Sequence, residues 1–146
     1  SVEELKQIVS WAQRPFILKG IMTARGAEKA LEAGASGIVV SNHGGRVLDH
    51  CPATAEVLPE IVDAVGGKMT IFVDGAIRSG MDMFKALALG ADAVLIGRPF
   101  VTTVYGGGEE GVQLYVQKLK AELADTMRMC GAHSLAEIKR SMLFGF

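Results

Sequence analysis

Short apolar runs alternate with longer amphipathic segments along most of this chain. Four mostly apolar runs, at residues 16–19, 37–40, 70–73 and 93–96, have the length of buried β-strands. The segments between them carry apolar residues at spacings of three and four, which is typical of helices that bury one face. Strands that alternate with helices predict a parallel sheet covered by helices, so the expected fold class is α/β.

Capping residues and glycines indicate where the helices begin and end. The first helix is expected over residues 2–13, before Pro15. Thr23 and Ser79 have the side chains to cap two further helices, each of which is followed by a glycine. The other expected elements are a helix after Pro52, a glycine loop at residues 106–108 before a long helix, and a short final helix that begins at Ser134.

The chain contains an internal repeat. Each residue of the first copy aligns with a residue of the second at the same separation along the chain as Phe16 and Phe72. Each copy spans two strands and the helix between them. A repeated module of this kind favours a (β/α)8 TIM barrel over a doubly wound open sheet, which is the competing fold. The matched identities are Phe16/Phe72, Ile21/Ile77, Lys29/Lys85, Ala30/Ala86, Leu31/Leu87, Gly34/Gly90 and Ala35/Ala91.

The chain is too short for a whole barrel of this type. A closed (β/α)8 barrel typically takes about 250 residues, and this chain has 146 and begins at Ser1 rather than Met. Four strand–helix units form half a barrel, which leaves two open edges with unpaired backbone groups. We therefore expect a missing N-terminal half as partner, or self-association through the open edges.

Composition and charge exclude several classes of protein. The net charge of −1 argues against nucleic acid or an anionic membrane as the main partner. No apolar run reaches the roughly 18 residues that would suggest a membrane helix. Cys51 and Cys130 fit no metal or redox spacing, so we expect free thiols in a reducing compartment, a cytoplasmic location and no metal centre.

A cluster of polar residues and glycines follows the second predicted strand. Its sequence is SNHGGR, over residues 41–46. A lone histidine is more often structural, but His43 is flanked by Ser41 and lies three residues before Arg46. This pattern favours a proton acceptor beside an arginine that binds a carboxylate.

Two later segments have the composition of a phosphate site. They follow neighbouring predicted strands, where the last strands of a barrel commonly bind phosphate through backbone N–H groups. The alternative is a pair of surface arginines that form ion pairs with acidic neighbours. The residues concerned are Asp74, Gly75, Ala76 and Arg78 in the first segment and Gly97 and Arg98 in the second.

Lys19 comes at the end of the first predicted strand. The functional interpretation is a fixed positive charge that faces an electron-accepting ring. The alternative is a lysine whose stem packs on apolar surface while its head reaches water.

These motifs closely resemble the FMN-dependent α-hydroxy acid oxidase/dehydrogenase family, of the glycolate oxidase and lactate oxidase type. The most specific likeness is in SNHGGR at 41–46, followed by LD at 48–49 and PAT at 52–54. VDGAIRSG at 73–80 and IGRP at 96–99 are similar to the family's flavin-phosphate segments. The likeness covers nearly the whole chain and implies one domain, residues 1–146, which is the C-terminal half of the family's barrel.

The resemblance also implies the roles of individual residues. His43 would take the proton of the substrate hydroxyl while hydride passes to the flavin, and Arg46 would bind the substrate carboxylate. Lys19 would lie by the flavin N1–O2 edge and stabilise the reduced anion. Ser41 would contact the flavin or its ribityl chain, and Asp74 the ribityl chain. The phosphate region would be held by Gly75, Ala76, Arg78, Gly97 and Arg98.

The chain departs from the family pattern at a few positions. Ala76 stands where the family usually has glycine, and Val47 where glutamine is common. The family's first barrel half carries active-site tyrosines, a second substrate arginine and polar contacts to the flavin ring, and none of these is in this sequence.

The function expected from the resemblance is FMN-dependent oxidation of a small 2-hydroxy acid to the 2-oxo acid, in a homo-oligomer that is a tetramer in the family. One alternative is another phosphate-binding barrel, of the isopentenyl-diphosphate isomerase or IMP dehydrogenase type. A second alternative is an isolated half barrel that is inactive alone and binds FMN or phosphate, or self-associates.

Overall fold

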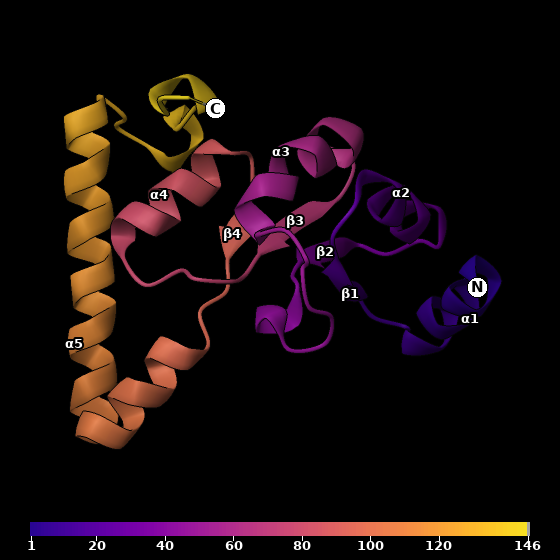
Figure 1. Cartoon of the computed structure of the whole chain (residues 1–146), viewed down its shortest axis with the longest axis horizontal. Helices are drawn as coiled ribbons and strands as arrows, with labels where there is room; N and C mark the ends of the chain where they lie inside the picture. Colours follow the sequence, from indigo (N-terminus) through magenta and orange to yellow (C-terminus); the bar gives the residue numbers. More distant parts are fainter. Residues whose placement is uncertain (146) are drawn as a thin grey trace.

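The computed structural model describes residues 1–145. It contains a four-stranded parallel sheet with helices packed on it. The elements in chain order are α1 (Val2–Ala12), β1 (Ile17–Ile21), α2 (Ala24–Glu32), β2 (Gly37–Val40), a 3-10 turn (His43–Gly45), α3 (Thr54–Val65), β3 (Thr70–Val73), α4 (Gly80–Ala88), β4 (Ala93–Val94), α5 (Arg98–Cys130) and two further 3-10 turns (Leu135–Glu137 and Arg140–Met142). Figure 1 shows α1 and α5 at opposite ends of the molecule, with the sheet between them. Within the described residues, no helix is long and apolar enough to cross a membrane.

The strands lie in the order β1-β2-β3-β4, and each neighbouring pair is parallel. β2 and β3 pair without a shift, from Gly37 opposite Thr70 to Val40 opposite Val73. A doubly wound sheet reverses its strand order at a switch point, and the sheet over residues 1–145 shows no such reversal. Sequential order is that of neighbouring strands in a (β/α)8 barrel, so the predicted α/β barrel arrangement is confirmed for these four units.

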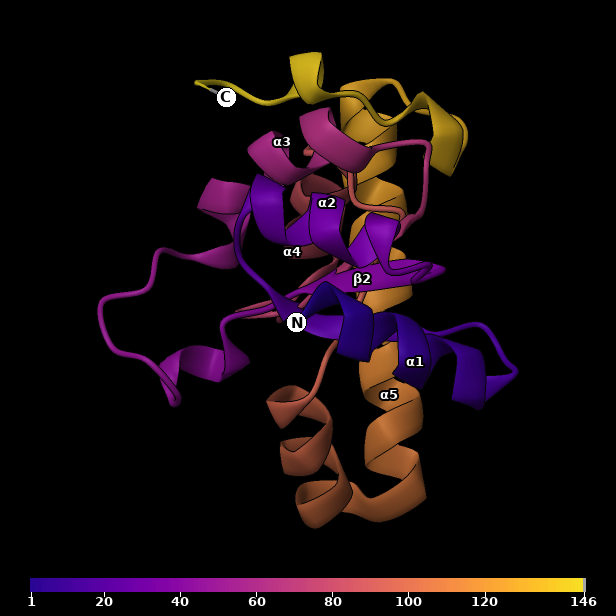
Figure 2. The same cartoon turned by 90° about the vertical axis from the view of Figure 1, so that its right-hand side faces the viewer.

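The main core lies between the sheet and its helices. Ile38 and Val40 of β2 and Ile71 and Val73 of β3 are at most 2% exposed and belong to one cluster with residues of α2 and α3. Alternate residues of a strand point to the same side, so these four side chains form one apolar face. In Figure 2, α2, α3 and α4 lie together on that side of the sheet. The helices therefore leave the carboxyl ends of the strands open.

The internal repeat is visible in the helices. α2 and α4 have nine residues each, and the Thr23 and Ser79 side chains accept the N–H groups of Gly26 and Asp82 in their first turns. Gly34 and Gly90 follow the two helices with φ of 88° and 103°, a left-handed conformation that favours glycine. The capping and glycine predictions are confirmed at both copies.

Lys19 lies inside β1 and not at the end of a strand, so that prediction was wrong. β1 continues to Ile21, and its register against β2 shifts between Lys19 and Ile21. Gly20, between them, has φ of 95°, which makes the shift a bulge that glycine permits. At the opposite edge of the sheet, β4 ends at Val94, two residues earlier than predicted.

The predicted glycine loop at residues 106–108 is confirmed only as a break at Gly108, because Gly106 and Gly107 are helical and α5 already begins at Arg98. The helix is broken only at Gly108, where φ is 54° and ψ is −135°. Figure 1 shows the result as two arms of α5 joined by a reversal. The arms approach closely, since a Cβ on Gly111 would lie 2.5 Å from the carbonyl oxygen of Thr103. Gly111 therefore allows the second arm to pack closely on the first, a contact that helix propensity does not predict.

The predicted short final helix is present only as a 3-10 turn over Leu135–Glu137. The Glu137 carboxylate accepts hydrogen bonds from the His133 backbone N–H and from the Ser134 hydroxyl. Ser134 is the N-cap residue as expected, but its side chain accepts no backbone N–H, and the turn that follows does not extend into an α-helix.

The first turn of α4 lies directly on the backbone of the second arm of α5. A Cβ on Gly80 would lie 2.6 Å from both the Glu122 Cβ and the Leu119 carbonyl oxygen, closer than real Cβ contacts. Only glycine fits at this contact, and the contact fixes α5 against the start of α4.

We predict that Gly80→Ala destabilises the fold by about 1–3 kcal/mol, the usual cost of overpacking. Gly107→Ala is the matched control, because a Cβ there meets no atom within 4 Å and alanine is the better helix former by roughly 1 kcal/mol. In urea unfolding, the free energy of unfolding should therefore fall in Gly80→Ala and rise in Gly107→Ala. Equal stability of Gly80→Ala and the unaltered chain would contradict the close contact.

Candidate functional site

An open cavity of about 700 Å³ lies where the four strands end, and nearly all the predicted site residues line it. It brings together residues from the segments after β2, β3 and β4 with Lys19 of β1. Ser41 is the exception, because it is fully buried beneath the cavity. The predicted residues in the lining are Lys19, His43, Arg46, Asp74, Gly75, Ala76, Arg78, Gly97 and Arg98.

A polar network at the base of the cavity joins β1 to the residues that follow β2 and β3. The Lys19 ammonium group donates to the Ser41 hydroxyl at 2.8 Å and lies 3.1 Å from Oδ2 of Asp74. The other carboxylate oxygen of Asp74, Oδ1, is buried and has no hydrogen-bond partner within the described residues. A buried acceptor without a partner is costly, so this atom is suited to accept a hydrogen bond from a ligand.

The His43 loop is held by its neighbours in the sequence. Its backbone N–H donates to the Ser41 hydroxyl at 3.2 Å, and the Asn42 side chain accepts the Gly44 N–H at 3.0 Å. His43 itself has a φ of 56°, so these contacts hold it in an unfavourable conformation. The sequence reading did not identify Asn42, although an asparagine just before a glycine turn is a known signal for such a contact.

Gly20 is a second residue that the sequence reading missed. A Cβ at this position would lie 2.7 Å from Cε1 of the His43 ring. The imidazole therefore lies against the β1 bulge, and the absence of a side chain at Gly20 makes room for it. A glycine inside an apolar strand signals a bulge or a close approach.

Three arginines around the cavity have no carboxylate partner among residues 1–145. Arg46 donates only to the His43 carbonyl oxygen, at 3.3 Å, and the ion pairs of the described residues include none of Arg46, Arg78 and Arg98. Nη2 of Arg98 lies 3.0 Å from where a Cβ of Gly44 would be. The alternative of surface arginines paired with acidic neighbours is therefore wrong, and unpaired guanidinium groups favour an anionic ligand.

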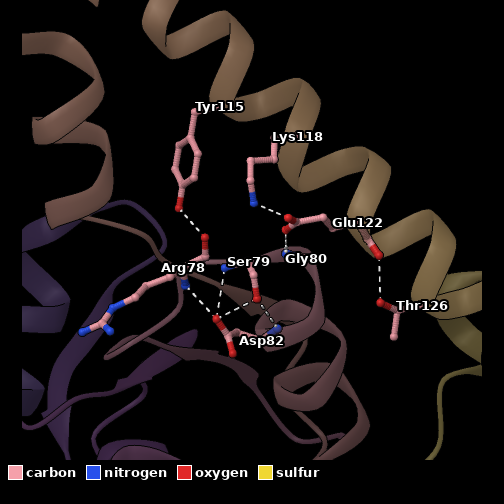
Figure 3. Close-up of polar contacts among 8 residues, drawn as sticks. All are labelled: Arg78, Ser79, Gly80, Asp82, Tyr115, Lys118, Glu122 and Thr126. Carbon is pink, nitrogen blue, oxygen red and sulfur yellow. Dashed lines mark hydrogen bonds and ion pairs between the residues drawn. The ribbon is translucent and has the colours of Figure 1, made fainter. Parts of the chain in front are cut away.

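The start of α4 is already occupied by the protein's own carboxylates (Figure 3). Oδ2 of Asp82 accepts the N–H groups of Arg78 and Ser79, both at 3.0 Å, and Glu122 accepts the Gly80 N–H at 2.8 Å. Burial acts to raise the pKa of Asp82, but these hydrogen bonds outweigh it and the pKa lies below its ordinary value. Lys118 and the Gly80 N–H likewise lower the pKa of Glu122.

The N-terminus of α5 differs from that of α4. Its N-cap residue, Gly97, has no side-chain capping bond, and a Cβ there would meet no atom within 4 Å. Helix N-termini favour anions through free N–H groups and the helix dipole. An anion in the cavity would therefore find free donors at Gly97 and Arg98 rather than at α4. No group of three or more metal-binding side chains gathers within residues 1–145.

Comparisons with known proteins identify relatives of the chain. The family model for FMN-dependent dehydrogenase matches residues 1–144. A peroxisomal (S)-2-hydroxy-acid oxidase of Oryza sativa subsp. japonica is 49% identical over 140 residues, which are 96% of this chain and 37% of that protein. An L-lactate oxidase of Roseobacter sp. (strain GAI101) is 43% identical over 146 residues, which are 100% of this chain and 40% of that protein.

The structural match is to mandelate oxidase, with a TM-score of 0.91 and 44% identity over 96% of this chain and 42% of that one. Another mandelate oxidase structure with the same score carries a C4a-OH-FMN adduct. The chain thus spans about two-fifths of the length of the relatives it matches.

Ala76 offers a direct test of the backbone of the turn after β3. Its φ is 58°, in the left-handed region that costs a residue with a Cβ about 1 kcal/mol. We predict that Ala76→Gly raises the free energy of unfolding by up to about 1 kcal/mol. Ala121→Gly in the exposed part of α5 is the control and should lower it by a similar amount. A loss of stability in Ala76→Gly would contradict the strained conformation.

Proposed function

The chain belongs to the FMN-dependent dehydrogenase family, and from that premise we propose that its cavity binds FMN and serves the oxidation of a small 2-hydroxy acid to the 2-oxo acid. Since the chain spans about two-fifths of its relatives' length, the whole reaction is proposed for a protein in which residues 1–146 form the C-terminal half of the barrel. The observation that carries the proposal is the Lys19–Ser41–Asp74 network beside His43 and three unpaired arginines.

The residues around the cavity fit the three parts of FMN. The buried, unpartnered Oδ1 of Asp74 would accept a hydrogen bond from a ribityl hydroxyl group. Arg78 and Arg98, with free donors at the start of α5, would hold the phosphate. The ammonium group of Lys19 supplies positive charge for the edge of the ring. Gly75 and Ala76 would bring backbone N–H groups to the phosphate end of the cavity.

His43 and Arg46 are proposed to act on the substrate. Bound FMN would accept a hydride from the α-carbon of the hydroxy acid. His43 would take the hydroxyl proton on its imidazole, which lies against the Gly20 bulge, while the Ser41 hydroxyl accepts the His43 backbone N–H. Arg46, whose guanidinium has no carboxylate partner in the described residues, would bind the substrate carboxylate and fix its orientation.

The competing barrel families, the oligomeric state and the cellular location were also predicted from the sequence. Membership of the family decides against the other phosphate-binding barrels considered above. A homo-oligomer, and a cytoplasmic location inferred from the two free cysteines, stay predictions, and the relatives include peroxisomal oxidases. The half barrel as an inactive FMN- or phosphate-binding unit remains the alternative for this chain alone.

The binding proposal predicts that this chain binds FMN at least about tenfold more tightly than riboflavin, because hydrogen bonds between charged groups contribute roughly 1.5–3 kcal/mol each. Arg98→Met should remove most of this preference and leave riboflavin affinity unchanged. Arg128→Met is the control, since Arg128 is on the same helix and pairs with Asp125. Fluorescence titration measures both affinities, and equal affinities for the two flavins would contradict the phosphate site.

In the whole protein, we predict that His43→Ala retains FMN but slows its reduction by the 2-hydroxy acid at least about 10²-fold, the usual scale for loss of a general base. His50→Ala is the control, because His50 is exposed and contacts only Asp49. Anaerobic stopped-flow absorbance measures the rate. Near-normal reduction by His43→Ala would remove His43 from the mechanism.

For Arg46→Lys, we predict weaker substrate binding with FMN affinity unchanged, because lysine lacks the two-pronged contact of a guanidinium group with a carboxylate. Arg25→Lys, at an exposed position of α2, should bind substrate normally. The dependence of the reduction rate on substrate concentration gives the affinity. An unchanged affinity in Arg46→Lys would assign the carboxylate to another residue.

A further inference from the structure

We propose that Tyr115 of α5 is a positioning residue that fixes the two phosphate-binding segments relative to each other. Glu122, about two helical turns further along α5, assists it. This inference rests on the proposed function, since it concerns the same FMN phosphate. It gives α5 a part in the site, which the sequence motifs did not indicate.

Tyr115 contacts both segments at once. Its hydroxyl donates to the backbone carbonyl oxygen of Arg78 at 2.9 Å. Its ring packs edge-on against Phe100, with ring centroids 5.1 Å apart and an interplanar angle of 73°. Phe100 comes two residues after Arg98 in the first arm of α5. One side chain therefore joins the turn after β3 to the helix that follows β4.

Glu122 holds the same turn from the next part of α5. Its carboxylate accepts the Gly80 N–H at 2.8 Å, and Lys118 pairs with the carboxylate from one turn earlier. Figure 3 shows Tyr115, Lys118 and Glu122 projecting from one face of α5 toward the turn. The close approach at Gly80 fixes the two helices, so these polar contacts have a rigid support.

The consequence concerns the direction of the Arg78 side chain. In Figure 3 the Arg78 guanidinium points away from the Ser79–Asp82 cluster, and Arg78 lines the cavity. Its backbone N–H is held by Asp82 and its carbonyl oxygen by Tyr115. With both backbone groups fixed, the guanidinium is directed toward the anion before a ligand arrives, which lowers the cost of binding.

The test compares FMN with riboflavin, which lacks the phosphate. Tyr115→Phe removes only the hydroxyl, and Tyr115→Leu also removes the ring contact with Phe100. We expect FMN affinity to fall about three- to tenfold in the first variant, the size of one lost hydrogen bond, and further in the second, with riboflavin affinity unchanged. Thr126→Val is the matched control, because its hydroxyl donates to the backbone carbonyl oxygen of Glu122 within α5 and both flavins should bind normally.

Glu122 variants separate charge from hydrogen bonding. Glu122→Gln keeps an oxygen that can accept the Gly80 N–H, and Glu122→Ala does not. FMN affinity should therefore fall in Glu122→Ala and return close to normal in Glu122→Gln. Equal losses in the two variants would overturn the part of the proposal that concerns this hydrogen bond.

Amide hydrogen exchange gives a readout that needs no flavin. Residues 75–80 should exchange faster in Tyr115→Phe than in Thr126→Val, and equal rates would overturn the inference. So would unchanged FMN affinity in both Tyr115 variants, or equal weakening of both flavins, while the proposed FMN site would stand. An unaltered chain that binds FMN no more tightly than riboflavin would instead overturn the proposed phosphate site, and this inference with it.

Discussion

The site depends on the positive charge of Lys19, which ties β1 to the residues that follow the two neighbouring strands. Lys19 is in β1, and its partners Ser41 and Asp74 follow β2 and β3. Parallel pairing of the strands brings these residues to one edge of the sheet. Ser41 is fully buried, so its hydroxyl needs partners, and it receives them from Lys19 and the His43 N–H. The candidate base is thus positioned by the same network that leaves one oxygen of Asp74 free.

The distribution of charge explains where an anion can bind. The start of α4 would ordinarily attract an anion, but Asp82 and Glu122 already occupy its N–H groups. The start of α5 has no such side-chain cap, and unpaired arginines surround it. The second arm of α5 therefore does more than pack against α4, because it supplies the carboxylate that closes one anion site and the tyrosine that braces the other.

Local signals made much of this predictable. Strands β2 and β3 agree with the apolar runs at 37–40 and 70–73, and Thr23 and Ser79 cap their helices as expected. What was missed depends on contacts between distant residues. The reversal of α5 at Gly108 brings Gly111 against Thr103 of the other arm, and Gly20 matters because of the His43 ring. The hydrogen bond between Tyr115 and Arg78 spans separate elements, and no periodicity in the sequence indicates it.

The central claim is that this cavity is built for FMN, and a crystal structure of the chain grown with FMN would test it most directly. The account predicts a ribityl hydroxyl within hydrogen-bond distance of Oδ1 of Asp74, and the phosphate between Arg78, Arg98 and the start of α5. A flavin bound elsewhere on the chain, or a phosphate held at the start of α4 in place of Asp82 and Glu122, would contradict it.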